Sequence, residues 1–141
     1  MNMMIKVHKV DVIGMLRDAS LRPTRQRVAL AEILFGPGDR HVTAEDLHAE
    51  ATAVSVRVSL ATVYNTLNQF TEAGLLREVA IEGSKTYFDT NTSNHHHFYL
   101  ESNGTLVDIP GGVQVTNVPQ APDGTEISRI DVIVRLAGRP A

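Results

Sequence analysis

Three consecutive histidines, His95, His96 and His97, are the residues of this 141-residue chain with the clearest capacity for chemistry. Alternate residues of a β-strand share a face, so His95 and His97 would point together, about 6–7 Å apart along the chain. That separation lets both imidazoles bind one metal ion, whereas His96 would face the other side. The alternative interpretation is a solvated histidine loop at the surface.

Two carboxylates and one further imidazole complete a possible metal site. Asp89 lies six residues before the histidine run, and Asp108 lies eleven residues after it, on a strand expected beyond the Asn103-Gly104 turn. His41 lies in a loop between two expected helices and, taken alone, would be an ordinary surface residue. Three imidazoles and two carboxylates form a donor set that suits Fe(II), Mn(II), Zn(II) or Ni(II) rather than Cu(I).

The chain has no cysteine, which excludes disulfide bonds, thiolate zinc sites, iron–sulfur clusters and cysteine nucleophiles. A metal-dependent hydrolase is a further interpretation of the histidines. No His-Glu-x-x-His pattern and no nucleophile elbow accompanies them, however, so the sequence predicts that the protein is not an enzyme.

A second group of residues is suited to reading DNA. Leu60, Val63, Leu67 and Phe70 are spaced as one apolar helical face, with Ser59 as the N-cap. The opposite face has no charge before Glu72 and carries small, hydroxyl and amide side chains, namely Ala61, Thr62, Tyr64, Asn65, Asn68 and Gln69. Such side chains suit base edges in the major groove, for example asparagine or glutamine pairing with adenine. The alternative is a solvated helix face, although those are usually rich in Glu and Lys.

Basic residues are placed to support such a helix. Arg22, Arg25 and Arg27 lie within six residues that contain no acid, and with Lys85 they are suited to phosphates or a narrow minor groove. Lys85 alone is equally well explained as a charge at a hairpin tip. The net charge of −3 disfavours a non-specific nucleic-acid coat but allows a sequence-specific binder with a local basic patch.

Turn and capping signals place these residues on a winged helix-turn-helix. Helices are expected over residues 10–19, after Thr24 until Gly36, after Thr43 to about residue 53, and after Ser59 until Gly74. Strands over 76–81 and 85–89 would then form a hairpin. Further strands are expected over 95–100, 105–109 and 127–137, with a Pro- and Gly-rich stretch between the last two and a boundary near 89–94.

No apolar run approaches the ~20 residues that a membrane span needs. The first twelve residues also lack the apolar core and cleavage site of a signal peptide. A cytoplasmic protein with no membrane partner is therefore expected.

Several segments together resemble the Fur superfamily of metal-responsive repressors. They are residues 21–27 (LRPTRQR), 41–47 (HVTAEDL), 60–67 (LATVYNTL), 74–75 and the histidine run. Within that superfamily the chain most resembles the Irr branch, the iron response regulators, through its three histidines, its lack of cysteine and its segment 126–132 (EISRIDV).

The resemblance implies an α+β fold, with a winged-helix DNA-binding domain over residues 1–90 and a small α/β dimerisation and sensing domain over residues 91–141. It implies a homodimer on a double-stranded DNA operator, with Tyr64 and its helix in the major groove and Arg22 and Arg27 near the backbone or minor groove. His41, Asp89, His95, His97 and Asp108 match a site for one divalent Fe, Mn or Zn ion per protomer. In Irr-like proteins the region of His95, His96 and His97 is associated with haem.

The chain departs from the superfamily in three places. Ser102 and Asn103 stand where the first Cys-x-x-Cys pair would be, so no structural cysteine-ligated zinc is expected. Asn94 replaces a histidine of the second family metal site. The Gly-Cys-Pro haem motif is absent, so any haem would be ligated by histidine.

These features predict an iron- or haem-responsive transcriptional regulator that is active when iron is scarce and is released from DNA by haem. Two alternatives within the superfamily are a peroxide sensor and a repressor that responds to Fe, Mn or Zn. A metal-independent winged-helix module that binds proteins is a third alternative, and it predicts no salt-dependent DNA binding.

Overall fold

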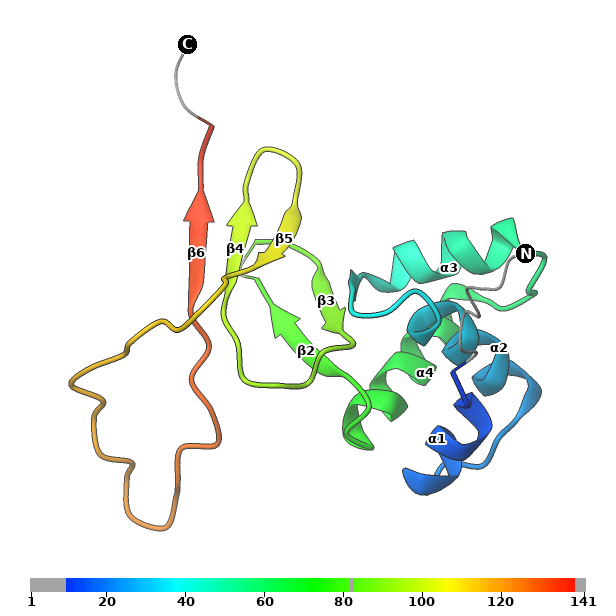
Figure 1. Ribbon diagram of the computed structural model, residues 1–141, viewed down its shortest axis with the longest axis horizontal. Coiled ribbons are helices and arrows are strands. Elements are labelled where there is room, and N and C mark those ends of the chain that lie inside the picture. Colours follow the sequence, from blue (N-terminus) through cyan, green and yellow to red (C-terminus); the bar gives the residue numbers. More distant parts are fainter. Residues whose placement is uncertain (1–9, 82, 139–141) are drawn as a thin grey trace, which may run out of the picture. The chain divides into compact units, whose positions relative to one another are not determined.

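The computed structural model describes residues 10–81 and 83–138, which fall into two compact units. The first unit ends at Thr92 and the second begins at Ser93. Among the described residues, the first unit carries all the helices together with one sheet, and the second carries a separate sheet (Figure 1). No helix of the described part is long and apolar enough to cross a membrane.

Four helices form most of the first unit, and each begins where a capping side chain is available. They are α1 (Val12–Asp18), α2 (Arg25–Phe35), α3 (Ala44–Ala53) and α4 (Leu60–Glu72). Asp11, Thr24 and Ser59 accept hydrogen bonds from backbone N–H groups of α1, α2 and α4. Thr43 and Asp46 form a reciprocal capping box at α3. The helix starts predicted from Thr24, Thr43 and Ser59 are confirmed. The helix predicted over residues 10–19 begins at Val12, after the Asp11 cap.

The wing of the first unit is a three-stranded antiparallel sheet. Its strands are β1 (His41–Val42), β2 (Arg77–Ala80) and β3 (Thr86–Asp89), in the order β1-β3-β2. The predicted hairpin is confirmed, with Gly83 at φ +78° in its turn. The placement of His41 in a loop was wrong, because His41 pairs with Asp89 as part of β1. A strand of two residues has no alternation that a sequence could reveal.

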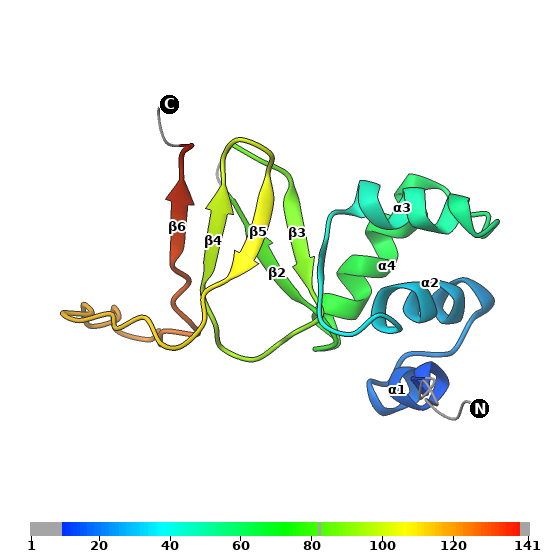
Figure 2. The same cartoon turned by 45° about the horizontal axis from the view of Figure 1, so that its top comes forward.

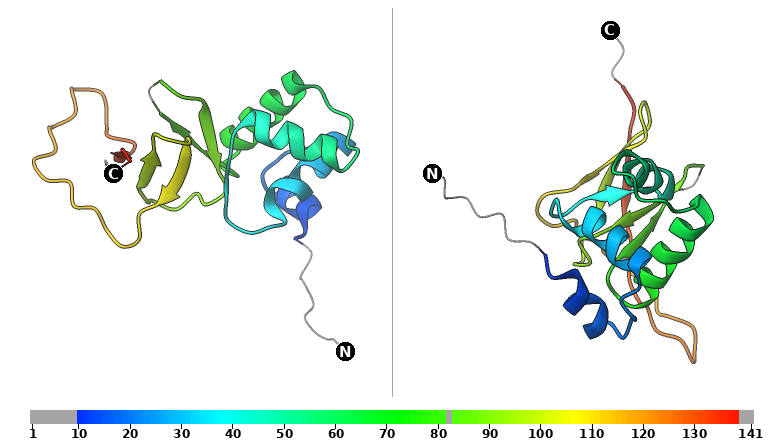
Figure 3. Two further views of the ribbon diagram at one scale, coloured as in Figure 1. Left: turned by 90° about the horizontal axis from the view of Figure 1, so that it is seen from above. Right: turned by 90° about the vertical axis from the view of Figure 1, so that its right-hand side faces the viewer.

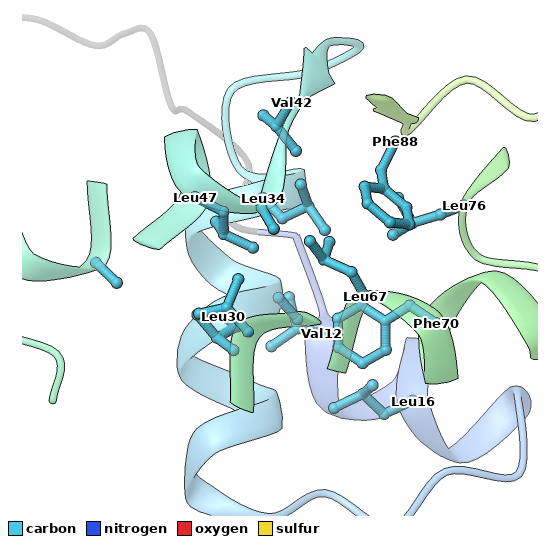
Figure 4. Packing of buried hydrophobic residues seen from close by; sticks show 14 residues of the cluster. Val12, Leu16, Leu30, Leu34, Val42, Leu47, Leu67, Phe70, Leu76 and Phe88 are labelled. Carbon is cyan, nitrogen blue, oxygen red and sulfur yellow. The ribbon is translucent and has the colours of Figure 1, made fainter. Parts of the chain in front are cut away.

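Buried apolar side chains from all four helices and the sheet form one core. Figure 4 shows Leu67 and Phe70 of α4 among residues of the other elements, including Leu16 of α1 and Phe88 of β3. Those four side chains are almost completely buried. The core therefore fixes α4 on its apolar face and leaves the opposite face outward, as the spacing predicted.

The second unit is built on the sheet β5-β4-β6, with β4 in the middle (Figure 2). Its strands are β4 (His97–Leu100), β5 (Thr105–Asp108) and β6 (Ile133–Leu136). Strand β5 runs antiparallel to β4, and β6 runs parallel to it. Strand β5 returns the chain to the end of the sheet where β4 begins, and residues 109–132 then lead as irregular chain to the parallel strand β6 (Figure 3).

The α+β class is confirmed, with helices in the first unit and a mixed sheet in the second. The described residues 93–138 contain no helix. The strand predicted over 127–137 is shorter than expected, because β4 offers only four residues for pairing with Ile133–Leu136. Ile127 and Ile130, which precede β6, are exposed.

A forked ion pair ties α3 to the start of β1. The Arg40 guanidinium donates to both Glu50 carboxylate oxygens, at 2.9 and 2.5 Å, and to the Ile33 carbonyl at 3.4 Å. Arg40→Ala is expected to lower the free energy of unfolding by about 1–2 kcal/mol, because it strands a half-buried carboxylate. Urea unfolding measures this.

The control for that prediction is Arg129→Ala in the second unit. Arg129 Nε donates to Asp131 at 2.8 Å, but both side chains are exposed, so the loss should stay below about 0.5 kcal/mol. Equal losses in the two variants would contradict the stabilising role of the Arg40–Glu50 pair.

Candidate functional site

Two imidazoles and one carboxylate converge at the start of the sheet of the second unit. The Nε2 atoms of His95 and His97 each lie 3.3 Å from Asp108 Oδ1. The two rings meet edge to face, with centroids 4.5 Å apart. Sheet register explains the convergence, because His97 is directly opposite Asp108 and His95 precedes it by two residues. His95 and His97 thus share a side, as the sequence predicted.

A neighbouring carbonyl fixes the proton on His95. The His95 Nδ1 atom lies 2.6 Å from the Ser93 carbonyl oxygen, which can only accept, so Nδ1 carries the hydrogen. In the neutral ring the Nε2 lone pair then points at Asp108 Oδ1, which is also an acceptor. These two hydrogen-bond acceptors repel each other unless a cation or an added proton lies between them. Metal-binding histidines are oriented by the same second-nitrogen contact.

His96 has a different environment from its neighbours. Its Nδ1 atom accepts a hydrogen bond of 3.1 Å from the Val132 backbone N–H, next to β6. The neutral ring therefore carries its proton on Nε2. His96 thus stabilises the chain just before β6 and is not part of the group formed by His95, His97 and Asp108.

The first unit holds a second pair of ligand-type side chains. His41 Nε2 lies 3.1 Å from Asp89 Oδ2, and the Asp89 side chain is 1% exposed. The other Asp89 oxygen accepts from the Asn91 backbone N–H at 2.9 Å. The antiparallel β1–β3 pairing places His41 beside Asp89. A carboxylate this buried needs such partners, because a polar group without a partner is costly to bury.

Arg77 is a residue of this region that the sequence analysis did not single out. It is directly opposite Asp89 in the β2–β3 ladder and is buried. Asp89 therefore lies between His41 and Arg77 in the register of the sheet. Arg77 could have been noticed from the sequence, because it is a charged residue at an inward-facing position of the predicted strand 76–81.

The face of α4 predicted to read DNA is outward. Ala61, Tyr64, Asn65, Asn68 and Gln69 are exposed and Thr62 is half-buried, whereas Val63, Leu67 and Phe70 are buried. Thr62 is partly used at the helix start, where its hydroxyl accepts from Ser59. The side-chain amides of Asn65 and Asn68 are available to a ligand that lies against α4, whereas Tyr64 and Gln69 have partners within the first unit.

The Tyr64 side chain on α4 forms a hydrogen bond with a residue of the preceding helix, α3. Its hydroxyl donates to Glu45 Oε2 of α3 at 3.1 Å. This hydrogen bond, followed by lost hydration and repulsion from the Glu45 charge, raises the pKa of Tyr64 above its usual 10.0. Tyr64 therefore stays protonated well above neutral pH, with its proton directed at Glu45. Sequence reasoning missed Glu45, because this contact joins residues 19 positions apart.

The predicted arginine patch is only partly free. Arg22 and Arg25 are exposed, and Lys85 is exposed immediately before β3. The Arg27 guanidinium instead donates to the Arg22 carbonyl and to the Gln69 side chain of α4. The structure thus brings Arg22, Arg27 and Gln69 together beside α4.

The chain belongs to the ferric uptake regulator family, whose model matches residues 18–118. It is 40% identical over 95 residues to the ferric uptake regulation protein of Vibrio parahaemolyticus, and the match covers 67% of this chain and 64% of that relative. The chain thus spans slightly less than two thirds of the length of the relative. The family is one of transcriptional regulators rather than of enzymes.

Solved structures of ferric uptake regulators share the fold. That of Vibrio cholerae superimposes with a TM-score of 0.71 at 24% identity, covering 91% of this chain and all of that one. The structure of the Pseudomonas aeruginosa regulator with manganese superimposes with a TM-score of 0.70 at 22% identity, covering 93% of this chain and all of that one. These two structures show the shared fold, and the family itself rests on the match of the family model to residues 18–118. The resemblance to Irr stays a prediction.

Proposed function

We propose that this protein is a homodimeric, metal-responsive DNA-binding transcriptional regulator. The observation that carries the proposal is the convergence of the His95 and His97 imidazoles on Asp108, in a chain whose α4 presents an uncharged polar face. The first feature suits a sensor and the second suits a reader of base edges. Residues 1–90 would bind DNA, and residues 91–141 would dimerise and sense.

The donor types fit a divalent ion. Two imidazole nitrogens and one carboxylate oxygen of the second unit lie close enough to one another to share an ion. The proposal extends to His41 and Asp89 of the first unit, whose types complete a five-ligand nitrogen/oxygen set. Such a set suits Fe(II), Mn(II) or Zn(II), and the similar Pseudomonas aeruginosa protein was solved with manganese.

Ligands drawn from both units would couple metal to DNA. An ion held by His41 and Asp89 as well as by the second unit restricts the orientation of the DNA-binding unit. A dimer reads two half-sites about one helical turn apart, so that orientation decides whether both α4 helices fit. Coupling of this kind is reciprocal and typically changes affinity by about 5- to 150-fold.

This reciprocity supplies the test of the proposed function. A duplex operator selected from a random library is titrated with the full chain after chelation, and again with saturating Mn(II) or, without oxygen, Fe(II). Operator affinity should differ by about tenfold, and operator should change the metal affinity by the same factor. No enrichment of any duplex would contradict DNA reading, and identical affinities would contradict metal response.

The iron-scarcity response predicted from the resemblance to Irr has its own arm of this experiment. If haem bound at His95 to His97 displaces the ion, saturating haem should release the operator. The Nδ1 atom of His96 accepts a hydrogen bond from the Val132 N–H, so the ring proton is on Nε2. His96 could therefore bind haem iron only if that proton moved or the hydrogen bond broke. Unchanged operator affinity with haem would remove this specific function and leave the metal response standing.

Peroxide sensing is the second specific output proposed for the same site. With Fe(II) held at the site, peroxide would be the oxidant: one peroxide oxygen would be added to His41 or His95 and the other would leave as water. The modified histidine would gain the mass of one oxygen atom. Mass spectrometry of the Fe(II)-loaded and Mn(II)-loaded chains distinguishes this output, since only iron supports the oxidation. An unmodified iron-loaded protein excludes it.

Dimerisation is proposed through the second unit. Val107, Val134 and Leu136 of its sheet are exposed, and so are Ile127 and Ile130 just before β6. Exposed apolar side chains on neighbouring elements are characteristic of an interaction surface. A second copy of this chain can cover them by a two-fold arrangement.

Val134→Asp is accordingly expected to shift the protein from dimer to monomer, raising the dimer dissociation constant by about tenfold or more, because it buries an unpaired charge in the interface. Light scattering across a concentration series measures the shift. The matched control is Val54→Asp in the first unit, at a valine that is also exposed. Dissociation by the Val54 variant alone would place the interface elsewhere.

A further inference from the structure

Arg27 links two segments of the first unit that are far apart in sequence. Its Nη1 group donates to the Arg22 carbonyl at 3.0 Å, in the loop before α2. Its Nε and Nη2 groups donate to Gln69 Oε1 at 3.3 and 3.0 Å, on the third turn of α4. One guanidinium thus fixes a side chain of α4 to the start of α2.

This contact determines which way the Gln69 amide faces. A guanidinium has only donors, so only the amide oxygen can lie against Arg27. The amide N–H groups are therefore directed away from Arg27, and they have no acceptor among the described residues. Gln69 cannot make a two-point contact with adenine, because that contact needs the oxygen as well. The prediction that the amides of this face pair with adenine is thus revised at Gln69.

A hollow lies beside this amide, between the start of α2 and α4. Arg22, Arg27, Gln69, Asn65 and Thr62 line it, and none of its lining residues is acidic. The Arg22 side chain also has no partner among the described residues. The hollow therefore presents unoccupied donors and positive charge. A phosphodiester oxygen has the complementary character, because it only accepts and carries negative charge.

Position along α4 favours the DNA backbone over a base. The N-terminal end of a recognition helix enters the major groove, and Gln69 lies two turns further on. Residues at that distance from the groove floor meet phosphates, which set register rather than sequence.

We propose that this hollow seats one operator phosphate per protomer, with the Gln69 amide and the Arg22 guanidinium as donors. Arg27 is the positioning residue that orients Gln69. The inference rests on the proposed function, because it specifies where a DNA backbone contact of the regulator lies.

The test uses the operator selected from a random library, carrying single neutral methylphosphonate substitutions at each backbone position. For the natural chain, one position per half-site should weaken binding by about tenfold, the value of a charged hydrogen bond. Gln69→Leu should weaken binding to unmodified operator by about the square of that factor, because a dimer loses the contact in both half-sites. It should reduce the effect at that one position, where only Arg22 would still contact the phosphate. Gln114→Leu, at an exposed glutamine of the second unit, should change nothing.

Arg27→Lys separates positioning from direct phosphate binding. Lysine keeps the charge but cannot hold the amide oxygen at two points, so affinity should fall as far as in the Gln69 variant. The slope of affinity against salt should stay within experimental error, since no phosphate charge contact is lost.

Three results would overturn the inference. They are full methylphosphonate sensitivity at every position in Gln69→Leu, natural affinity in Arg27→Lys, and a salt slope in Arg27→Lys lowered by about one charge. If instead the natural chain selects no duplex at all, the proposed function itself fails, which is a distinguishable outcome.

Discussion

Replacing both His95 and His97 with alanine is expected to weaken divalent metal binding by about a hundredfold or more. In the proposed site the two imidazoles are the nitrogen donors of the second unit, and their loss would leave only the exposed Asp108 carboxylate. Loss of residues that merely orient metal ligands already costs about 10- to 100-fold in affinity, so loss of two ligands should exceed that range. Competition against a chromophoric chelator measures the change with Mn(II) and Zn(II).

The matched control for that prediction lies inside the same histidine run. His96→Ala removes an imidazole of equal size whose Nδ1 atom is engaged by the Val132 N–H. It should keep metal affinity within a few fold of the natural chain while loosening the segment before β6. Because His97 is 2% exposed, each variant should also be unfolded in urea to confirm that it remains folded. Unchanged metal content in the double variant would show that the site is misplaced.

The second large effect is expected on operator affinity, when Asn65 is replaced with alanine. Asn65 lies on the exposed face of α4, in the second turn from the Ser59 cap, and has no side-chain partner among the described residues. One good amide–base contact contributes about 1–3 kcal/mol of discrimination. A dimer makes that contact twice, so Asn65→Ala should lose about 2–6 kcal/mol, or roughly 30- to 10⁴-fold in operator affinity.

Stability separates this effect from a folding defect. Alanine is a better helix former than asparagine, so the free energy of unfolding should be unchanged or slightly higher. Affinity for random duplex should change little, because random duplex is bound through phosphates. Glu32→Ala, on the exposed side of α2, serves as the control and should alter operator affinity by no more than about twofold. Equal operator affinity for Asn65→Ala and the natural chain would exclude Asn65 from base reading.

The sequence was most informative where structure is set locally. Helix α3 was predicted from Thr43 and its capping box, and α4 from an apolar spacing that the core of the first unit confirms. The shared side of His95 and His97 followed from the two-residue period of an extended chain. Such features depend on neighbours within about four residues, which a single sequence displays directly.

Contacts between distant segments were the ones that could not be predicted. The Arg27–Gln69 hydrogen bonds join residues 42 positions apart. Arg27, which the sequence predicted as a phosphate ligand, is therefore a partner of α4. The short strand β1 exists only because β3 is there to pair with it. The end of the predicted strand 127–137 was likewise set by the length of β4, not by its own alternating pattern.

The brevity of β1 has a consequence for the lifetime of a bound ion. His41 begins a strand of only two residues. Arg40, just before it, is hydrogen-bonded to Thr90, and Val42, just after it, is completely buried in the core. Short edge segments open locally at a small fraction of the free energy of global unfolding. If His41 is a ligand of the proposed ion, local opening at Arg40 and His41 would release that ligand while the buried Val42 stays in the core. In the proposed metal-bound state, such opening would let the ion exchange on a timescale much faster than that of global unfolding.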